Sequence, residues 1–165
     1  MSKEGNIVKF RDELMHTLKY LKLQQERFID KFDIDTDIDE SVYALDVLRL
    51  ILQPIVENAI YHGLENIKDK GIINISAKRV ETFFNIYVND TGLGIPEDEL
   101  IKINNLLVSY QPGENLESKM IGIFNVNARI KYYFGTEYGL KISSVYRKGT
   151  TVKICLPAMV NDAPL

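Results

Sequence analysis

The sequence predicts an α+β fold, in which helices pack on one face of a mixed, mostly antiparallel sheet. Two pairs of segments with alternating apolar and polar residues support this class, 72–80 with 83–89 and 138–146 with 150–156. Short connections join each pair, which is typical of antiparallel hairpins. Segments with helical periodicity lie before, between and after the first pair, so strands and helices alternate irregularly, as in a two-layer sandwich.

The composition favours a single globular domain over residues 1–165, because 45% hydrophobic and 26% charged residues are ordinary proportions for such a domain. The net charge of −3 argues against a nucleic-acid partner, which usually selects a basic surface. No run of 18 apolar residues is present, so we expect no membrane span and no direct membrane contact. Cys155, the single cysteine, lies in an apolar alternating segment and is expected to be a core residue in a reducing compartment.

Residues 9–35 are expected to form an N-terminal helix and strand. Apolar residues recur at helical spacing between charged ones and predict an amphipathic helix over 9–30. These apolar residues are Phe10, Leu14, Leu18, Leu21 and Phe28. A short strand follows at Phe32 and Ile34. Residues 35–40 are acidic but lack the glycine and closing glutamate of a calcium loop, so we interpret them as a solvated loop or strand end.

A second helix is predicted over residues 46–63. Its apolar stripe consists of Leu48, Leu52, Ile55, Ala59 and Ile60. Pro54 should kink or restart this helix, because proline removes an internal hydrogen-bond donor. Asn58 and His62 are four positions apart and therefore share one face of the helix, while Gly63 can end it.

Two further helices and a loop complete the predicted order. Pro96 and the three acidic residues after it are typical of a helix start, and apolar spacing continues to Leu107. Residues 108–120 lose this periodicity and are the candidate for a mobile loop. The last helix is predicted over 122–134 and ends at Gly135.

The first candidate for chemistry is the segment of residues 89–96, which has a carboxylate at the end of a strand. Asp90 in this position can accept a hydrogen bond from an exocyclic amine. Gly92 and Gly94 follow at once, and glycines let the backbone come close to a flat ring because they carry no Cβ. Such a short pattern also occurs in ordinary turns, so this segment alone does not decide between the two interpretations.

Three segments in order carry a more specific signal: QPIVENAIYHG at 53–63, NDTGLGIP at 89–96, and IGIFNV at 121–126 with Arg129. Together they resemble the nucleotide site of the GHKL ATPases, which include histidine kinases, type II topoisomerases, the heat-shock chaperone ATPase and mismatch-repair ATPases. The resemblance implies the Bergerat-type two-layer sandwich, with ATP and Mg²⁺ as ligands and an ATP lid at 108–120.

The resemblance also implies roles for individual residues. Asp90 would bond the adenine amino group, with Gly92 and Gly94 beside the base and ribose. Asn58 would coordinate Mg²⁺, for which a neutral amide oxygen is a suitable ligand. Glu57 would help polarise the reacting group, and His62 would contact phosphate.

The segment before the last helix departs from the family pattern. Gly122 would expose backbone N–H groups to phosphate oxygens at the helix N-terminus. The family usually has a second glycine two residues earlier, where this chain has Met120, and Lys119 is the candidate to supply a compensating charge.

Two further residues of the C-terminal part match the family. Thr150 resembles a strand threonine that supports the adenine through water, although its β-propensity explains it equally well. Arg129 is interpreted as structural, in a buried ion pair, rather than as a phosphate ligand.

The flanking segments resemble the catalytic ATP-binding domain of LytS/YesM-type sensor histidine kinases over residues 13–157. The matching segments are LKYL at 18–21, QQ at 24–25 with RF at 27–28, NVNARI at 125–130 and GTTVKICLP at 149–157. This implies transfer of the ATP γ-phosphate to a histidine on a separate helix of the parent kinase, and then to a response regulator. His16 is not followed by the expected aromatic residue, so it is not assigned as the acceptor.

The resemblance further implies a cytoplasmic domain of a membrane-anchored sensor, monomeric when isolated. Three alternatives remain open: a free-standing serine kinase of the anti-sigma type, a non-catalytic nucleotide-sensing module, and an unrelated α+β binding domain. Membership of the topoisomerases or chaperones is disfavoured, because 165 residues leave no room for their transducer domains.

Overall fold

The computed structural model describes residues 6–114 and 119–160 and confirms the predicted fold class. The elements along the chain are β1 (Ile7–Lys9), α1 (Phe10–Arg27), β2 (Phe32–Ile38), the 3-10 turn η2 (Glu40–Val42), β3 (Asp46–Leu48), α2 (Gln53–Asn58), the π-helix η3 (Ala59–Leu64), β4 (Gly71–Val80), β5 (Phe83–Asp90), α3 (Glu97–Ser109), α4 (Ile121–Phe134), β6 (Gly139–Val145) and β7 (Gly149–Pro157). Among these, no helix combines the length and apolar character needed to cross a bilayer.

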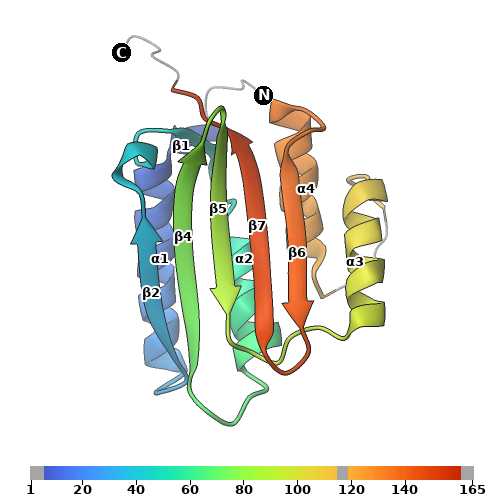
Figure 1. The fold of residues 1–165 in the computed structure, drawn as a ribbon. Helices are drawn as coiled ribbons and strands as arrows, with labels where there is room; N and C mark the ends of the chain where they lie inside the picture. The colour runs from blue at the N-terminus through green and yellow to red at the C-terminus, as the bar shows by residue number, and fades with distance from the viewer. Residues whose placement is uncertain (1–5, 115–118, 161–165) are drawn as a thin grey trace.

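The main sheet has five strands in the order β2-β4-β5-β7-β6. Only β2 and β4 are parallel, and both predicted hairpins are present as the antiparallel pairs β4–β5 and β6–β7. Helices α1, α2 and α4 lie on one face of this sheet, and α3 lies beside the edge strand β6 (Figure 1). The predicted two-layer arrangement is therefore confirmed.

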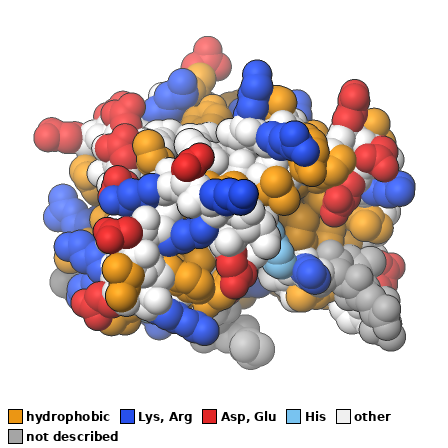
Figure 2. Space-filling view, turned by 90° about the horizontal axis from the view of Figure 1, so that it is seen from below, with side chains coloured by type: hydrophobic (Ala, Val, Ile, Leu, Met, Phe, Trp, Pro, Cys, Tyr) orange, Lys and Arg blue, Asp and Glu red, His pale blue; other side chains and the backbone are white. Residues whose placement is uncertain are grey.

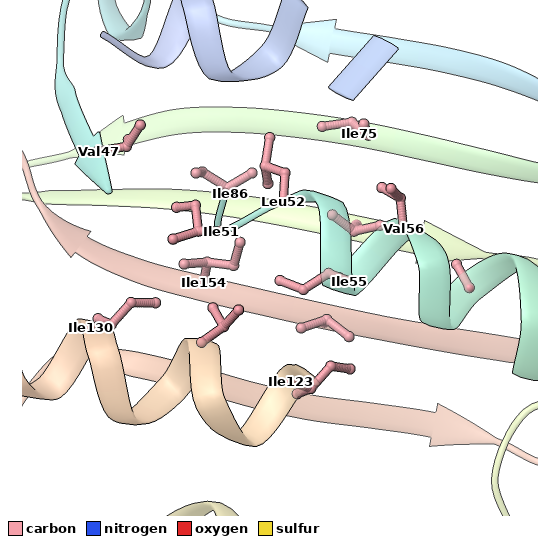
Figure 3. Packing of buried hydrophobic residues seen from close by; sticks show 14 of the residues in the cluster. Val47, Ile51, Leu52, Ile55, Val56, Ile75, Ile86, Ile123, Ile130 and Ile154 are labelled. Carbon is pink, nitrogen blue, oxygen red and sulfur yellow. The ribbon is translucent and has the colours of Figure 1, made fainter. Parts of the chain in front are cut away.

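The core lies between the sheet and this helical layer. Ile86 of β5 and Ile154 of β7 are fully buried, and they face Ile55 of α2 and Ile123 of α4 (Figure 3). At the other side of the layer, the ring of Phe10 in α1 meets Phe84 edge to face, with 5.0 Å between centroids. Burial of apolar surface here stabilises the sheet and fixes α2 above its central strands.

The prediction of a helix starting at residue 46 is wrong. Residues 46–48 form the short strand β3, which pairs with β1. Leu50 has a left-handed backbone (φ 59°), and the helix begins only at Gln53, with Pro54 in its first turn. The apolar residues before the helix are buried in the core, and their spacing in the sequence resembles that of a helix. Pro54 lies in the first turn of a new helix, as predicted.

Two other predicted boundaries differ from the structure. Strand β2 extends to Ile38, beyond the expected end at residue 35, so most of the acidic segment 35–40 is a strand end, one of the two interpretations that the sequence left open. Helix α3 continues to Ser109 and thus takes the first residues of the predicted loop 108–120. Residues 115–118 of that loop lie outside the described residues, and the assignment of a lid stays a prediction.

The helix that starts at Gln53 widens into a π-helix over its second half. The N–H of Glu65 donates to the carbonyl of Ile60, five residues earlier, at 2.9 Å. Such a widened turn is often found at functional sites. Here it contains His62 and Gly63, two residues of the family-like segment.

A buried carboxylate from α1 fixes the segment that precedes α2. Glu13 is only 2% exposed. Its side chain accepts hydrogen bonds from the backbone N–H groups of Leu50 at 2.9 Å, Ile51 at 2.9 Å and Leu52 at 3.1 Å. These donors precede the first turn of α2, so Glu13 ties the position of this helix to α1.

Replacing Glu13 with alanine is expected to lower the free energy of unfolding by about 3–5 kcal/mol, because the buried N–H groups of Ile51 and Leu52 and the half-buried one of Leu50 would lose their acceptor. Urea unfolding at neutral pH measures this change. Glu26→Ala, an exposed position on the same helix, serves as the matched control and should change stability little. A loss below about 1 kcal/mol for Glu13→Ala would contradict the anchoring role.

Candidate functional site

The candidate site lies at the end of the sheet where β5 terminates. Here the loop after Asp90 runs between the π-helix η3 and the turn that joins β6 and β7. This end is at the bottom of Figure 1 and faces the viewer in Figure 2, where Lys and Arg side chains are spread among hydrophobic ones. The strand, the helix and the turn thus bring the family-like segments 53–63 and 89–96 together.

Asp90 is held at the last position of β5, with its carboxylate half-buried. The N–H of Gly92 donates to Oδ1 at 2.9 Å. Burial raises the pKa of the Asp90 carboxyl to about 6. Hydrogen bonds from the backbone of Gly92 and Thr150 act in the opposite direction and lower this pKa, but burial has the larger effect. A carboxylate that keeps its charge at neutral pH despite this burial is a strong acceptor for a donor that approaches it from the solvent side.

Glycines let the backbone of η3 touch the loop after Asp90. A Cβ atom on Gly63 would lie 2.8 Å from Oδ1 of Asp90, and one on Gly92 would lie 2.4 Å from the carbonyl carbon of Gly63. The N–H of Leu93 donates to the carbonyl of Gly63 at 3.0 Å. Only residues without a side chain allow this approach.

Gly94 supports the other side of the same loop. It has a left-handed backbone (φ 69°), and a Cβ atom there would lie 2.2 Å from the carbonyl oxygen of Val145 in the β6–β7 turn. The missing side chains of Gly92 and Gly94 therefore face neighbouring backbone. This packing is a reason for the two glycines in addition to the predicted approach to a base and ribose, which stays a prediction.

A cavity of about 530 Å³ opens beside Asp90. It brings together most of the residues that the sequence singled out, namely Asn58, His62, Asp90, Gly94, Lys119 and Thr150. The sequence analysis did not place Glu99, Ile103 and Tyr146 at a site, and it named Leu93, Ile95 and Pro96 only as members of the segment 89–96. The aromatic Tyr146, directly before the hairpin turn, is the one of these that the sequence could have indicated.

A second cavity, of about 370 Å³, lies between α2 and the start of α4. Glu57 and Gly122 line it, and it shares Asn58, His62 and Lys119 with the first cavity. The two spaces are therefore neighbours, and Asn58 lies between them together with His62, Lys119 and Met120. Gly92 lines neither of them and lies buried behind Asp90.

Polar groups at the junction of the cavities are open to a ligand. The side chain of Asn58 has no hydrogen-bond partner among residues 6–114 and 119–160. Glu57 accepts a hydrogen bond from Gln53 at 3.0 Å. In the same ranges, no group of three or more His, Cys, Asp and Glu side chains is arranged to hold a metal ion.

The start of α4 borders both cavities. The helix begins at Ile121, and Met120 precedes it without a side-chain cap, so the N–H groups of Ile121 and Gly122 lack intrahelical acceptors. Met120 is 9% exposed and lines both cavities, while Lys119 beside it is exposed. The departure from the family pattern thus introduces a thioether where the family has a glycine.

Thr150 and Arg129 have defined structural partners. The hydroxyl of Thr150 lies 2.9 Å from that of Ser144, which also accepts from the N–H of Ile95 at 2.9 Å. Ser144, which the sequence analysis missed, therefore connects the loop with strand β7. Arg129 is half-buried and donates to the backbone carbonyl oxygen of Arg49 at 2.8 Å, whereas the sequence analysis expected a buried ion pair.

Comparisons with known proteins agree with the sequence signal. Residues 44–160 match the family model described as histidine kinase-, DNA gyrase B-, and HSP90-like ATPase. The chain is 34% identical over 153 residues to the sensor protein LytS of Staphylococcus saprophyticus, covering 93% of this chain and 25% of that protein. It is 32% identical over 152 residues to the sensor histidine kinase YesM of Bacillus subtilis, covering 92% of this chain and 24% of that protein.

Solved structures share the fold at lower sequence identity. The catalytic domain of histidine kinase ThkA has a TM-score of 0.64 at 16% identity, covering 92% of this chain and 95% of that domain. Histidine kinase ThkA in complex with the response regulator protein TrrA also matches, with a TM-score of 0.64 at 15% identity, covering 95% of this chain and 42% of that kinase chain.

The raised pKa of Asp90 predicts a pH-dependent stability. The folded state holds the proton more tightly than the unfolded state, so this group's stabilising contribution is full below about pH 4 and is lost as the pH rises through about 6. Asp90→Asn keeps an acceptor oxygen for Gly92 but carries no charge. Its stability relative to the wild type is therefore expected to increase from acidic to neutral pH in urea unfolding.

The titration of Asp90 itself can be followed by NMR of ¹³C-labelled carboxyl groups. We expect its midpoint near pH 6 in the nucleotide-free protein. A midpoint near pH 4, the usual value for aspartate, would contradict the burial of this carboxyl.

Proposed function

The chain belongs to the family of histidine kinase-, DNA gyrase B- and HSP90-like ATPases, and from this premise we propose that it is the ATP-binding catalytic domain of a LytS/YesM-type sensor histidine kinase. Family membership confirms the resemblance to GHKL ATPases. The observation that carries the proposal is the half-buried Asp90 carboxylate at a cavity that continues past Asn58 to the start of α4.

The residues present are suited to Mg-ATP as the phosphoryl donor. Asp90 would accept from the adenine amino group, with Gly94 and Thr150 in the wall of the same cavity and Gly92, which lines neither cavity, holding the Asp90 carboxylate through its N–H group. The first N–H groups of α4, including that of Gly122, have no acceptor within the helix and can donate to phosphate oxygens. The charge of Lys119 and the ring of His62 border the same space.

Mg²⁺ would supply charge neutralisation for the transferred phosphoryl group. Asn58 is the proposed protein ligand, because its amide lies at the junction of the two cavities and has an oxygen suited to Mg²⁺. Glu57 lines only the second cavity and would polarise the acceptor group there.

The chain spans about a quarter of the length of the relatives it matches, so the activity of the whole protein is part of the proposal. We place the phosphoacceptor histidine on another segment of a longer, membrane-anchored sensor. A response regulator would then take the phosphoryl group, and this domain would work in the cytoplasm. The domain alone is expected to be monomeric.

One observation favours a second candidate, a non-catalytic nucleotide-sensing module. Met120 lines both cavities beside the start of α4, where the family pattern has a glycine. A side chain at this position narrows the approach to the helix N-terminus. This candidate predicts weak nucleotide binding and no phosphoryl transfer.

Titration calorimetry with ATP, with and without Mg²⁺, tests the nucleotide site. We expect ATP binding that GTP does not reproduce. Guanine has a carbonyl oxygen at the ring position where adenine has the amino group that Asp90 would accept from. Loss of a charge-assisted hydrogen bond of about 1.5–3 kcal/mol should weaken ATP binding of Asp90→Asn by about tenfold to over a hundredfold. Equal affinities of the wild type for ATP and GTP would contradict the assignment of Asp90.

Phosphoryl transfer can be tested with free imidazole as a substitute for the unidentified acceptor histidine. With Mg-ATP and excess imidazole, the wild type should form phosphoimidazole, which ³¹P NMR detects and acid destroys. Asp90→Asn at the same nucleotide concentration is the control and should form much less. ATP binding without any such product would favour the sensing module, and an acid-stable phosphoserine on a protein acceptor would favour the serine kinase.

A further inference from the structure

Hydrogen bonds join helix α1 to the helix formed by α2 and η3, and to the segment just before it, at a constant sequence spacing. We call this row of contacts the polar seam. The backbone N–H of Leu50 donates to Glu13, Gln53 bonds His16, and the hydroxyl of Tyr61 bonds Gln24; the partners in each pair are 37 positions apart. The two helices therefore run in the same direction, with matching turns facing each other. Every step along this seam joins α1 to the helix that contains Glu57 and Asn58, or to the segment directly before it.

Two hydrogen bonds of this seam lead from α1 to the proposed acid Glu57. Gln53 Nε2 donates to Glu57 Oε1 at 3.0 Å, and Gln53 Oε1 lies 3.2 Å from Nε2 of His16. The carboxylate of Glu57 can only accept, so the amide N–H group of Gln53 is directed to it and the amide oxygen faces His16. In this contact the ring of His16 donates to Gln53 when Nε2 carries the proton.

Tyr20 approaches the same carboxylate from the next turn of α1. Burial, together with the negative charge of Glu57, raises the pKa of the Tyr20 hydroxyl to about 12. Glu57 is thus bonded by Gln53 of its own helix and lies near Tyr20 of α1. It also lines the second cavity, together with Asn58 and Gly122.

We propose that Gln53, oriented by His16, is a positioning residue that holds the Glu57 carboxylate at the second cavity. This inference rests on the proposed function, because it gives Glu57 a task in the transfer step. Gln53 and His16 line neither the cavity beside Asp90 nor the second cavity. Helix α1 would therefore set the geometry of transfer without contact to the nucleotide, and a displacement of α1 would change the transfer rate and leave ATP affinity unaltered.

The test compares Gln53→Met and His16→Ala with a matched control, Gln25→Met. Gln25 is also a glutamine whose amide donates a hydrogen bond to a neighbouring element, the carbonyl of Phe32 at 3.0 Å, and within residues 6–114 and 119–160 it makes no hydrogen bond to Glu57 or to His16. Three quantities are measured in the 165-residue chain: the ¹³C resonance of the Glu57 carboxyl, the Kd for ATP and the rate of imidazole phosphorylation. Glu57→Gln identifies the resonance.

We expect Gln53→Met and His16→Ala to move the Glu57 resonance and Gln25→Met to leave it in place. Gln53→Met should slow imidazole phosphorylation by about tenfold to a hundredfold, the effect of a small misplacement of a reacting group, while the Kd for ATP stays within about twofold. An unmoved Glu57 resonance in Gln53→Met, or a Kd that rises in step with the loss of rate, would overturn the proposal. If the wild type phosphorylates no imidazole, the proposed function fails, and the resonance still decides whether Gln53 positions Glu57.

Discussion

The backbone of η3 touches the loop after β5 with no side chain between them, and the rest of the site depends on this contact. Gly63 and Gly92 make it possible, and the hydrogen bond from Leu93 to Gly63 fixes it. It brings the end of the central sheet next to the face of the helix that contains Asn58. A Cβ atom at Gly63 would collide with the Asp90 carboxylate, and one at Gly92 would collide with the backbone of Gly63.

The contact is supported by the hydrophobic core and by α1. Ile55 and Ile86 fix α2 over the sheet, while Glu13 fixes its start. The core and α1 hold the site together although it contains an energetically unfavourable charge. Burial disfavours the charged form of Asp90, as its raised pKa indicates. A carboxylate kept in this state has few competing water molecules and is well suited to select one donor, and such groups gather at functional sites.

The sequence is most informative where the signal is local. Both hairpins and the helix after Met120 follow from periodicity, and the order of the family-like segments singles out Asp90 and Asn58. Strand β3 could not be predicted, because Leu48 and Leu52 imitate helical spacing while the left-handed Leu50 between them leaves no signal in a single sequence. The site assignments taken from the resemblance stay predictions, although the cavities bring most of these residues together.

Contacts between distant segments could not be predicted from the sequence for a different physical reason. Glu13 looks like one more charge on an amphipathic helix, and only the folded chain shows that residues 50–52 surround it. The roles of Ser144 and Gln53 likewise depend on their partners. Ser144 accepts a hydrogen bond from Ile95 on another element, and Gln53 donates one to Glu57 in the next helical turn. Polar residues that satisfy buried backbone groups are therefore the part of a site that periodicity does not reveal.

A crystal structure of this chain with Mg²⁺ and a non-hydrolysable ATP analogue tests the central claim most directly. The account predicts the adenine amino group within hydrogen-bond distance of the Asp90 carboxylate, with the phosphates directed past Asn58 toward the N-terminus of α4. A nucleotide bound elsewhere, or a base in this cavity whose amino group does not meet Asp90, would contradict the account.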